Sequence, residues 1–325
     1  MNPQKLRSRC IGTIAGFAIG DSLGMPAEFL SREQIRQYYG KPISGFMKAH
    51  PGHASDFLPQ GSYTDNTQTM LATAECLIED GRMDPARHAD ALLAWYRNTV
   101  PHRTPSAANL QACKHLSAGR PWNKSGVFSS CCGAAVRMPP IGLFYHNQTE
   151  ELTRAALDNC IITHNEPRAR AAAVCVAYLT ARLLQSGDNS WPGDQVLETA
   201  DHIASMDKDL AALLRWTTQM VHLPPEEALF EIGTSSDAIE AVPAAIYCFL
   251  KNPTKFSSAV LTAVNAGEAA DAIGALTGSF IGSLAGAEAL DPQWLAEVEN
   301  SDVLIGIGEN LAELLCRKHA NAASD

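Results

Sequence analysis

Two sets of glycines recur at four-residue intervals near the two ends of this 325-residue chain. The sets are Gly12, Gly16, Gly20 and Gly24, and Gly274, Gly278, Gly282 and Gly286. A glycine inside a helix costs about 1 kcal/mol relative to alanine, so these glycines need a compensating gain, which close approach of two backbones provides. Four-residue steps drift around a helix by about 40° each, which matches ridges that pack at a steep angle. The pattern therefore predicts two helices that cross steeply at the centre of the fold, rather than a long seam.

This crossing would bring two carboxylates together. Asp21 lies near the end of the first glycine helix, and Asp271 lies at the start of the second. We expect both at one shared cleft, with Asp21 as a candidate substrate-binding residue.

Helical signals dominate the rest of the chain. Asp84-Pro85 and Asn165-Glu166-Pro167 each combine a cap with a first-turn proline, and Gly81 ends the helical run that follows Asn66. Further helices are expected over residues 194–205, 209–220, 225–232, 237–250, 255–266, 272–287 and 302–319, with a kink or break at Pro243. Alternation of apolar and polar residues, which is typical of β-strands, is hard to find, and no linker or repeat divides the chain. We predict an all-α fold in a single domain, residues 1–325, in which residues 40–61 form an irregular loop suited to a lid.

Charge and cysteine usage narrow the classes of partner and compartment. The net charge is −10 without a basic run, so the counterion release that drives nucleic-acid binding has no evident source. No secretory signal or strongly apolar stretch of about 20 residues is evident, and the nearest membrane candidate, 272–287, is rich in glycine and serine. The nine cysteines are scattered without a CxxC pair, which favours a reducing compartment. We expect a cytoplasmic protein that binds a small molecule, with no nucleic acid and no membrane as partner.

The segment Thr64-Asp65-Asn66 directly precedes a predicted helix. Taken alone, it is read as a helix cap, because all three side chains accept hydrogen bonds from first-turn amides. The alternative is a cation site, since hydroxyl, carboxylate and amide oxygens suit Mg²⁺. Asp271 is by itself an ordinary carboxylate at a helix N-terminus.

Together with the glycine stripes, these residues resemble the ADP-ribosylglycohydrolase family. The resemblance covers most of the chain, and the order and spacing of its segments are specific. The segments are residues 12–28, 62–68, 133–142, 163–164, 240–245 and 271–294. The resemblance implies a single large orthogonal helical domain with a central polar cleft. It also implies hydrolysis of the glycosidic bond at the ribose C1 of an ADP-ribosyl small molecule or an ADP-ribosylated protein.

The resemblance further implies a metal centre. In the family, a Thr-Asp-Asp-Thr run and an Asp-Thr-Asp-Thr run hold two Mg²⁺ ions. Here Asn66 replaces one acid of the first run, and residues 269–272 read Ala-Ala-Asp-Ala. The surviving candidate ligands are Thr64, Asp65, Asn66 and Asp271. Because two carboxylates poorly balance two divalent ions, we expect one Mg²⁺ or none.

Glu28 and Asp65 are the candidate catalytic residues. Glu28 follows a Gly-Met-Pro turn and is, taken alone, an ordinary surface or capping carboxylate. In several family members the acid at this place handles the attacking water, and a carboxylate with a raised pKa in a semi-enclosed cleft serves as a general base near neutral pH.

The remaining candidate substrate-binding residues lie in three segments. Cys131, Cys132 and Gly133 stand where the family has a Gly-Asn-Gly turn, and Cys132 replaces the asparagine. The two cysteines are either small packing residues or the source of a thiolate, for which His164 is the base to test. His164 itself is a loop histidine that the resemblance places near the ribose. Gly233, Thr234 and Ser235 follow a short helix and offer amides and hydroxyls to a ribose or phosphate.

The leading hypothesis is therefore an ADP-ribosyl hydrolase with reduced metal dependence. Two alternatives remain open. One is a catalytically silent protein that binds ADP-ribose, which the missing ligands at Asn66, Ala269 and Ala272 would explain. The other is a hydrolase of a simpler ribonucleoside or ribosyl phosphate.

Overall fold

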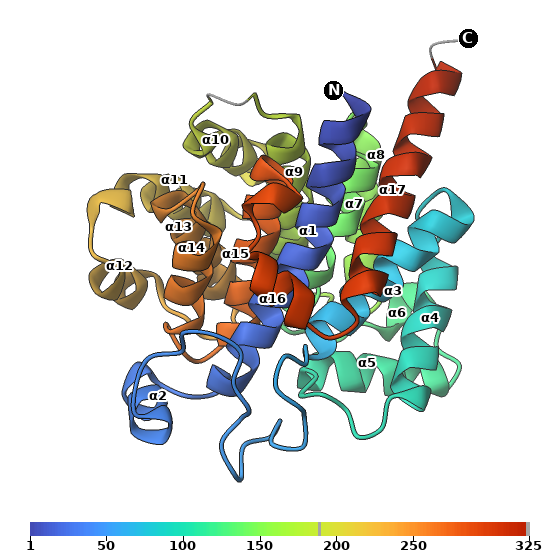
Figure 1. Cartoon of the computed structure of the whole chain (residues 1–325). Coiled ribbons are helices and arrows are strands. Elements are labelled where there is room, and N and C mark those ends of the chain that lie inside the picture. Colours follow the sequence, from blue (N-terminus) through green and yellow to red (C-terminus); the bar gives the residue numbers. More distant parts are fainter. Residues whose placement is uncertain (188–189, 323–325) are drawn as a thin grey trace.

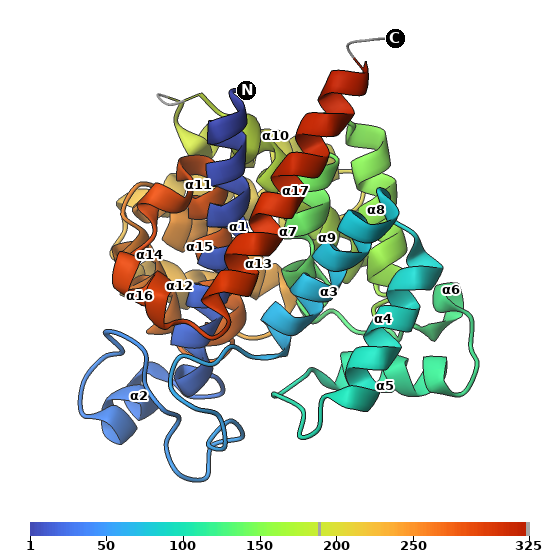
Figure 2. The ribbon, with the colours of Figure 1, turned by 45° about the vertical axis from the view of Figure 1, so that its right-hand side comes forward.

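A pair of antiparallel helices, α1 (Pro3–Gly24) and α15 (Ala270–Ala285), runs through the middle of the computed structural model (Figure 1). The structure describes residues 1–187 and 190–322. Helix α17 (Ser301–Ala322) packs along the other side of α1 (Figure 2). The flanking helices are α2 (Arg32–Tyr39), α3 (Asp65–Asp80), α4 (Pro85–Asn98), α5 (Ala107–Ser117), α6 (Trp122–Ser125), α7 (Pro139–Phe144), α8 (Thr149–Ile161), α9 (Pro167–Gln185), α10 (Pro192–Ile203), α11 (Lys208–Gln219), α12 (Pro225–Ile232), α13 (Ala238–Lys251), α14 (Phe256–Val264) and α16 (Pro292–Glu297). Short 3₁₀ turns add η1 (Met25–Ala27), η2 (Ala135–Arg137), η3 (Met220–His222) and η4 (Ala287–Ala289).

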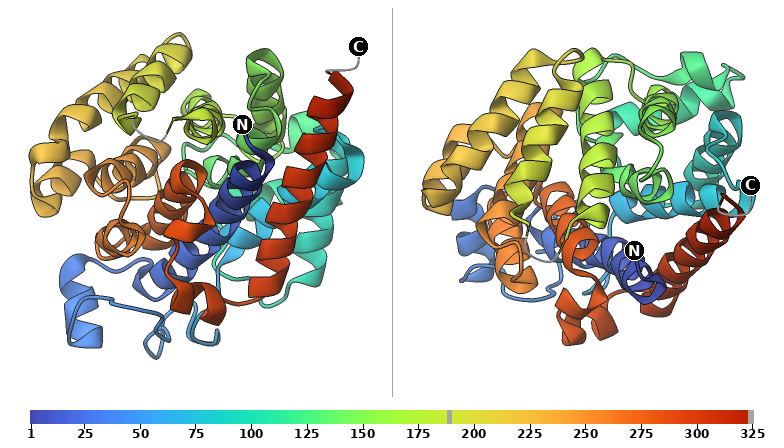
Figure 3. Two further views of the ribbon diagram at one scale, coloured as in Figure 1. Left: turned by 45° about the horizontal axis from the view of Figure 1, so that its top comes forward. Right: turned by 90° about the horizontal axis from the view of Figure 1, so that it is seen from above.

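The predicted all-α class is confirmed. Over residues 1–187 and 190–322, extended pairing is limited to two isolated bridges, Val127 with His164 and Cys131 with Asp237. Helices α10 to α14 lie on one side of the central pair and α3 to α8 on the other (Figure 3). One buried apolar cluster extends from Leu6 in α1 to Leu315 in α17. The prediction of a single domain has no separate test here and stays a prediction.

The helix boundaries follow the local signals. Asp84 caps α4 and Glu166 caps α9, each with proline in the first turn. Gly81 ends α3 with a φ of +63°, a left-handed conformation that glycine adopts without a steric penalty. Of the kink or break predicted at Pro243, the break is wrong, because α13 continues through this residue, and the kink stays a prediction. Residues 40–61 contain no helix, as expected.

The glycine stripes meet face to face, as predicted, but in a different geometry. Gly16 lies against Gly278, Gly20 against Gly274, and Gly24 against Ala270. A Cβ built on Gly278 would lie 2.1 Å from the Gly16 carbonyl oxygen, so no side chain fits between the helices. The contact persists over the whole of both stripes, so the predicted steep crossing was wrong. The ridge argument assumes side chains that interdigitate, whereas here the two backbones touch directly.

Helix α1 also corrects the membrane prediction. The segment Pro3–Ala27 is long and apolar enough to cross a membrane, and it is a stronger candidate than residues 272–287. Its most apolar window is, however, 100% buried inside the fold, which is the behaviour of a core helix.

Candidate active site

A cavity of about 730 Å³ opens where the N-terminal ends of four helices meet. Its wall includes the first residues of α3, α5 and α15 and the two serines just before α13. The expected polar cleft is therefore present. The acids on the wall are Glu28, Asp65, Glu268 and Asp271, and none of the described residues that line it is Lys, Arg or His.

Asp21 anchors one of these helix ends. Its carboxylate accepts hydrogen bonds from the backbone N–H groups of Thr64 and Thr67, both at 3.0 Å, and from both hydroxyls, at 2.7 and 2.5 Å. Burial raises the pKa of Asp21 to about 6, against the effect of these hydrogen bonds. Asp21 is fully buried and is not part of the cavity wall. Asp21 therefore positions the start of α3 and does not contact the cavity directly.

Asp65 and Asp271 approach each other at one end of the glycine seam, the contact between the glycine stripes of α1 and α15. The Asn66 Nδ2 donates to Asp271 Oδ2 at 2.8 Å, and the Thr64 hydroxyl lies 3.4 Å from the same oxygen. On the other side, Asn109 Nδ2 lies 3.4 Å from Asp65 Oδ2. Burial, followed by the charge of Asp21, raises the pKa of Asp271 to about 7. Burial and the charge of Asp271 raise the pKa of Asp65 well above its usual range.

Glu28 follows the 3₁₀ turn η1 and lies on the same wall. Only 7% of its surface is exposed, and its Oε2 has no hydrogen-bond partner among the described residues. Burial and the neighbouring Asp271 raise the pKa of Glu28 well above its usual range, while a hydrogen bond with Thr104 acts in the opposite direction. The His53 ring from the long loop holds the Glu28 carbonyl oxygen at 2.8 Å.

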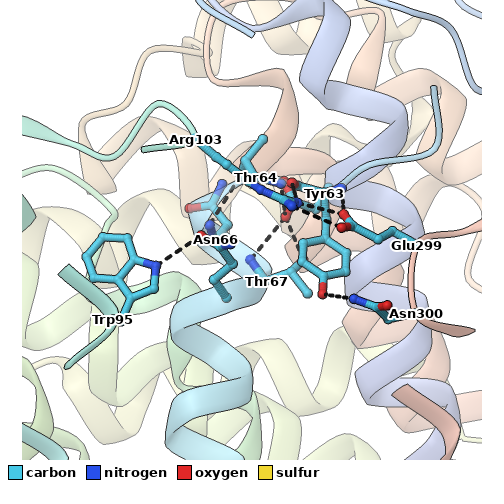
Figure 4. A network of polar contacts seen from close by, with 10 residues as sticks. Tyr63, Thr64, Asn66, Thr67, Trp95, Arg103, Glu299 and Asn300 are labelled. Atoms are coloured by element: carbon cyan, nitrogen blue, oxygen red, sulfur yellow. Dashed lines mark hydrogen bonds and ion pairs between the residues drawn. The ribbon is translucent and has the colours of Figure 1, made fainter. Parts of the chain in front are cut away.

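A polar network fixes the segment that enters α5. Arg103 pairs with both oxygens of Glu299, at 2.6 and 2.9 Å, and donates to the Tyr63 carbonyl oxygen at 2.8 Å (Figure 4). The Arg103 carbonyl oxygen accepts the Asp65 backbone N–H at 3.1 Å. Asn300 completes the network by donating to the Tyr63 hydroxyl at 2.9 Å. The turn just before α17 thus holds the wall of the cavity in place.

The Cys131–Gly133 segment lines the cavity, and the thiol that contacts an imidazole is that of Cys131. Cys131 Sγ lies 2.9 Å from His164 Nε2. Cys132 is buried, and burial raises the pKa of its thiol well above the usual range. Cys132 is therefore a poor source of a thiolate. His164 is fully buried and is not part of the wall; its ring lies behind the wall residues Cys131 and Gly133.

The segment 233–235 offers less to an anion than expected. The Ser235 backbone N–H already donates to Glu240 Oε2 at 2.9 Å, and the Thr234 carbonyl oxygen accepts the Ala269 N–H. A Cβ on Gly233 would collide with the Glu240 side chain. Of the three residues, only Ser235 lines the cavity. The negative charge of Glu240 would repel a phosphate bound at this segment.

The corner of the cavity beside Asp271 is where the resemblance placed a cation. Thr64, Asp65 and Asp271 bring side-chain oxygen atoms to this corner, Asn66 turns its amide nitrogen towards Asp271, and the side chains of Ala269 and Ala272 offer no ligand atom. In the described part of the chain, no group of three His, Cys, Asp or Glu side chains is placed to hold a metal ion. The Asn66 amide donates a hydrogen bond to Asp271, so the carboxylate already has a partner on that side.

Several wall residues escaped the sequence analysis. They are Phe29, Thr104, Pro105, Ser106, Ala107, Ala108, Asn109, Ser129, Ser236 and Glu268. The run from Thr104 to Asn109 carries a signal that could have shown it, because Ser106 caps α5 and accepts the Asn109 N–H at 3.2 Å. Nothing in the local sequence indicates that this helix end faces Asp65.

Comparison with known proteins gives a consistent result. The family model described as ADP-ribosylglycohydrolase matches residues 2–321. An uncharacterized protein of Archaeoglobus fulgidus is 33% identical over 305 residues, which cover 94% of this chain and 96% of the relative. The ADP-ribosylarginine hydrolase Tri1 of Pseudomonas putida is 24% identical over 331 residues, covering 96% of this chain and 80% of that protein. A solved structure described as an ADP-ribosylglycohydrolase-related protein complex shares the fold, with a TM-score of 0.77, 24% identity, and coverage of 96% of this chain and 99% of that one.

Proposed function

The chain belongs to the ADP-ribosylglycohydrolase family and is a hydrolase, and from this premise we propose that it cleaves the bond at C1 of the ribose in an arginine-linked ADP-ribosyl substrate. The observation that carries this proposal is the charge of the cavity wall. Four acids and no basic side chain face the space among the described residues. Such a wall complements a cationic guanidinium and the positive charge that develops at the anomeric carbon as the bond breaks.

Glu28 is the residue we assign to the attacking water. It has the free oxygen that such a role requires, because Oε2 is buried without a partner. Its raised pKa brings the carboxyl closer to the pH at which it exchanges a proton with water. Asp65 and Asp271 are assigned to stabilise the developing charge and to orient the ribose hydroxyls.

A cation, if bound, belongs to the same corner of the cavity. We propose that Thr64, Asp65, Asn66 and Asp271 hold at most one Mg²⁺, and that a bound Mg²⁺ supplies charge that orients the ribose and a water molecule. The helix ends supply the remaining positive potential for the diphosphate, since no basic side chain among the described residues does so on this wall.

The test compares two acid-to-amide variants in the full chain. Glu28→Gln removes the assigned base, and Glu268→Gln makes the same change at an exposed acid of the same wall. Release of ADP-ribose from ADP-ribosyl-arginine and from ADP-ribosyl-serine is followed by chromatography, with and without Mg²⁺. We expect turnover of the arginine compound and a loss of about 100-fold or more in Glu28→Gln only. Equal effects in both variants would refute the role of Glu28, and turnover of the serine compound alone would refute the proposed linkage.

A further inference from the structure

The cavity contains a second reactive group that hydrolysis does not use, the pair formed by Cys131 and His164. Cys131 is partly exposed on the wall, and its sulfur contacts the ring of the buried His164 at 2.9 Å. The segment is held firmly, because the Cys132 N–H donates to the Ser236 carbonyl oxygen and the Ala238 N–H donates to the Ser130 carbonyl oxygen, both at 2.8 Å. The thiol therefore has a fixed place beside the ligand space.

The hydrogen-bond chain behind this pair determines which way the protons point. The Arg137 guanidinium can only donate, and it donates to Thr163 Oγ1 at 2.7 Å. The hydroxyl's other partner is His164 Nδ1 at 2.8 Å, so the arrangement that leaves no hydroxyl hydrogen unpaired has Thr163 donating to Nδ1. The ring proton then sits on Nε2 and points at the sulfur of Cys131.

This polarity places an N–H donor against the sulfur of Cys131. An N–H that donates to sulfur stabilises a thiolate more than a thiol. The buried guanidinium of Arg137 lies at the other end of this series of hydrogen bonds. It has no carboxylate partner among the described residues, so its positive charge is not neutralised there. His164 acts here as a donor that positions and polarises, not as a base.

We infer that Cys131 is a site of covalent modification, at which a small hydroperoxide oxidises the thiolate and thereby closes the cavity to its ligand. The sulfur attacks the outer peroxide oxygen, the S–O bond forms as the O–O bond breaks, and hydroxide or alkoxide leaves and is protonated by water. Sulfur loses two electrons, the peroxide gains them, and the product is a sulfenic acid. The cavity can receive such a molecule, because Glu28 Oε2 and Asn109 Oδ1 are buried acceptors without a partner among the described residues.

Cys316 provides the internal control. It is the other partly exposed thiol of the nine, lies on α17, and makes no hydrogen bond through its sulfur within the described part of the chain. Exposure alone would therefore make the two thiols react alike, whereas the proposed hydrogen-bond chain activates only Cys131.

The experiment measures each thiol separately in the folded full chain. Carbamidomethylation by iodoacetamide, followed by peptide mass spectrometry, should be about tenfold faster at Cys131 than at Cys316, and ADP-ribose should slow it. Thr163→Val, which removes the hydroxyl, should lower the Cys131 rate about tenfold, whereas Thr163→Ser should retain it. Hydrogen peroxide with dimedone should add the sulfenic-acid adduct at Cys131.

Two results would overturn the inference: equal rates at Cys131 and Cys316 in the unmodified sequence, or a dimedone adduct that avoids Cys131. The mass measurements need no turnover, so they remain decisive if the proposed hydrolase activity fails. Two arms rest on the proposed function: the slower reaction in the presence of ADP-ribose, and the loss of hydrolysis after treatment with hydrogen peroxide.

Discussion

Replacing Gly20 with alanine tests the glycine seam at the point where it borders the acid cluster. A Cβ on Gly20 would lie 2.0 Å from the Gly274 carbonyl oxygen, and ordinary contacts begin at 3.4 Å, so the helices must separate by 3.4 − 2.0 = 1.4 Å. A gap of even 0.5–1 Å forfeits about a quarter to a half of the contact energy along the affected surface. Because the obstacle is backbone, we place the cost at about 3–4 kcal/mol, at and just above the upper end of the usual range for overpacking. The higher helix propensity of alanine offsets about 1 kcal/mol of this cost, so the free energy of unfolding should fall by about 2–3 kcal/mol.

Gly306→Ala is the matched control for this experiment. Gly306 lies inside α17, and nothing would meet its Cβ within 4 Å. This change should therefore stabilise the protein by up to about 1 kcal/mol through propensity alone. Urea unfolding followed by circular dichroism measures both variants against the parent chain. If Gly20→Ala unfolds at the same urea concentration as Gly306→Ala, the backbone contact does not carry the stability assigned to it.

Two further predictions concern the acid cluster and the buried imidazole. The double change Asn66→Asp with Ala269→Asp should increase Mg²⁺ affinity in calorimetry, because it restores two acids beside Asp271; an unchanged affinity would place the cation site elsewhere. Burial and the charge of Arg137 lower the pKa of His164 from 6.5 to about 3. The neutral buried ring therefore contributes fully to stability above pH 6.5, and this contribution is lost as the pH falls towards 3. His164→Gln should therefore remove about 1.5 kcal/mol from the difference in unfolding free energy between pH 6.5 and pH 5. An unaltered difference would contradict the neutral buried ring.

Much of the fold could be predicted because its signals are local. Proline after a capping residue begins α4 and α9, and a left-handed glycine ends α3. The four-residue glycine spacing showed that two distant helices touch, since nothing else compensates for glycine inside a helix. The spacing did not show the angle between them. That angle depends on whether side chains or bare backbones form the contact, and the repeat is the same in both cases.

The site was predictable where it lies on those two helices and less so elsewhere. Asp21 and Asp271 were placed together because the glycine stripes bring their helices together, whereas Asp65, at the start of α3, was added by the family resemblance. The choice between Cys131 and Cys132 depended on how an irregular turn orients two adjacent side chains, and no periodicity describes such a turn. The Arg103–Glu299 pair joins positions 196 residues apart on two loops, so neither residue carries a local mark of its partner.

The position of Asp271 depends on the register of the seam, and the seam alone does not determine that register. A slip of one turn, four residues or about 6 Å, would still place glycine against glycine. It would also exchange the buried Thr13–Ser283 hydrogen bond of 2.9 Å for an equivalent one to Ser279, whose hydroxyl has no partner among the described residues. The contacts at the two ends remove this ambiguity. Ser8 Oγ accepts the Ala287 N–H at 3.0 Å at one end, and Asn66 donates to Asp271 at 2.8 Å at the other, and both would be lost in a slip. The polar ends therefore fix where Asp271 stands, and the residue that departs from the family's acid pattern, Asn66, is one of those that hold it there.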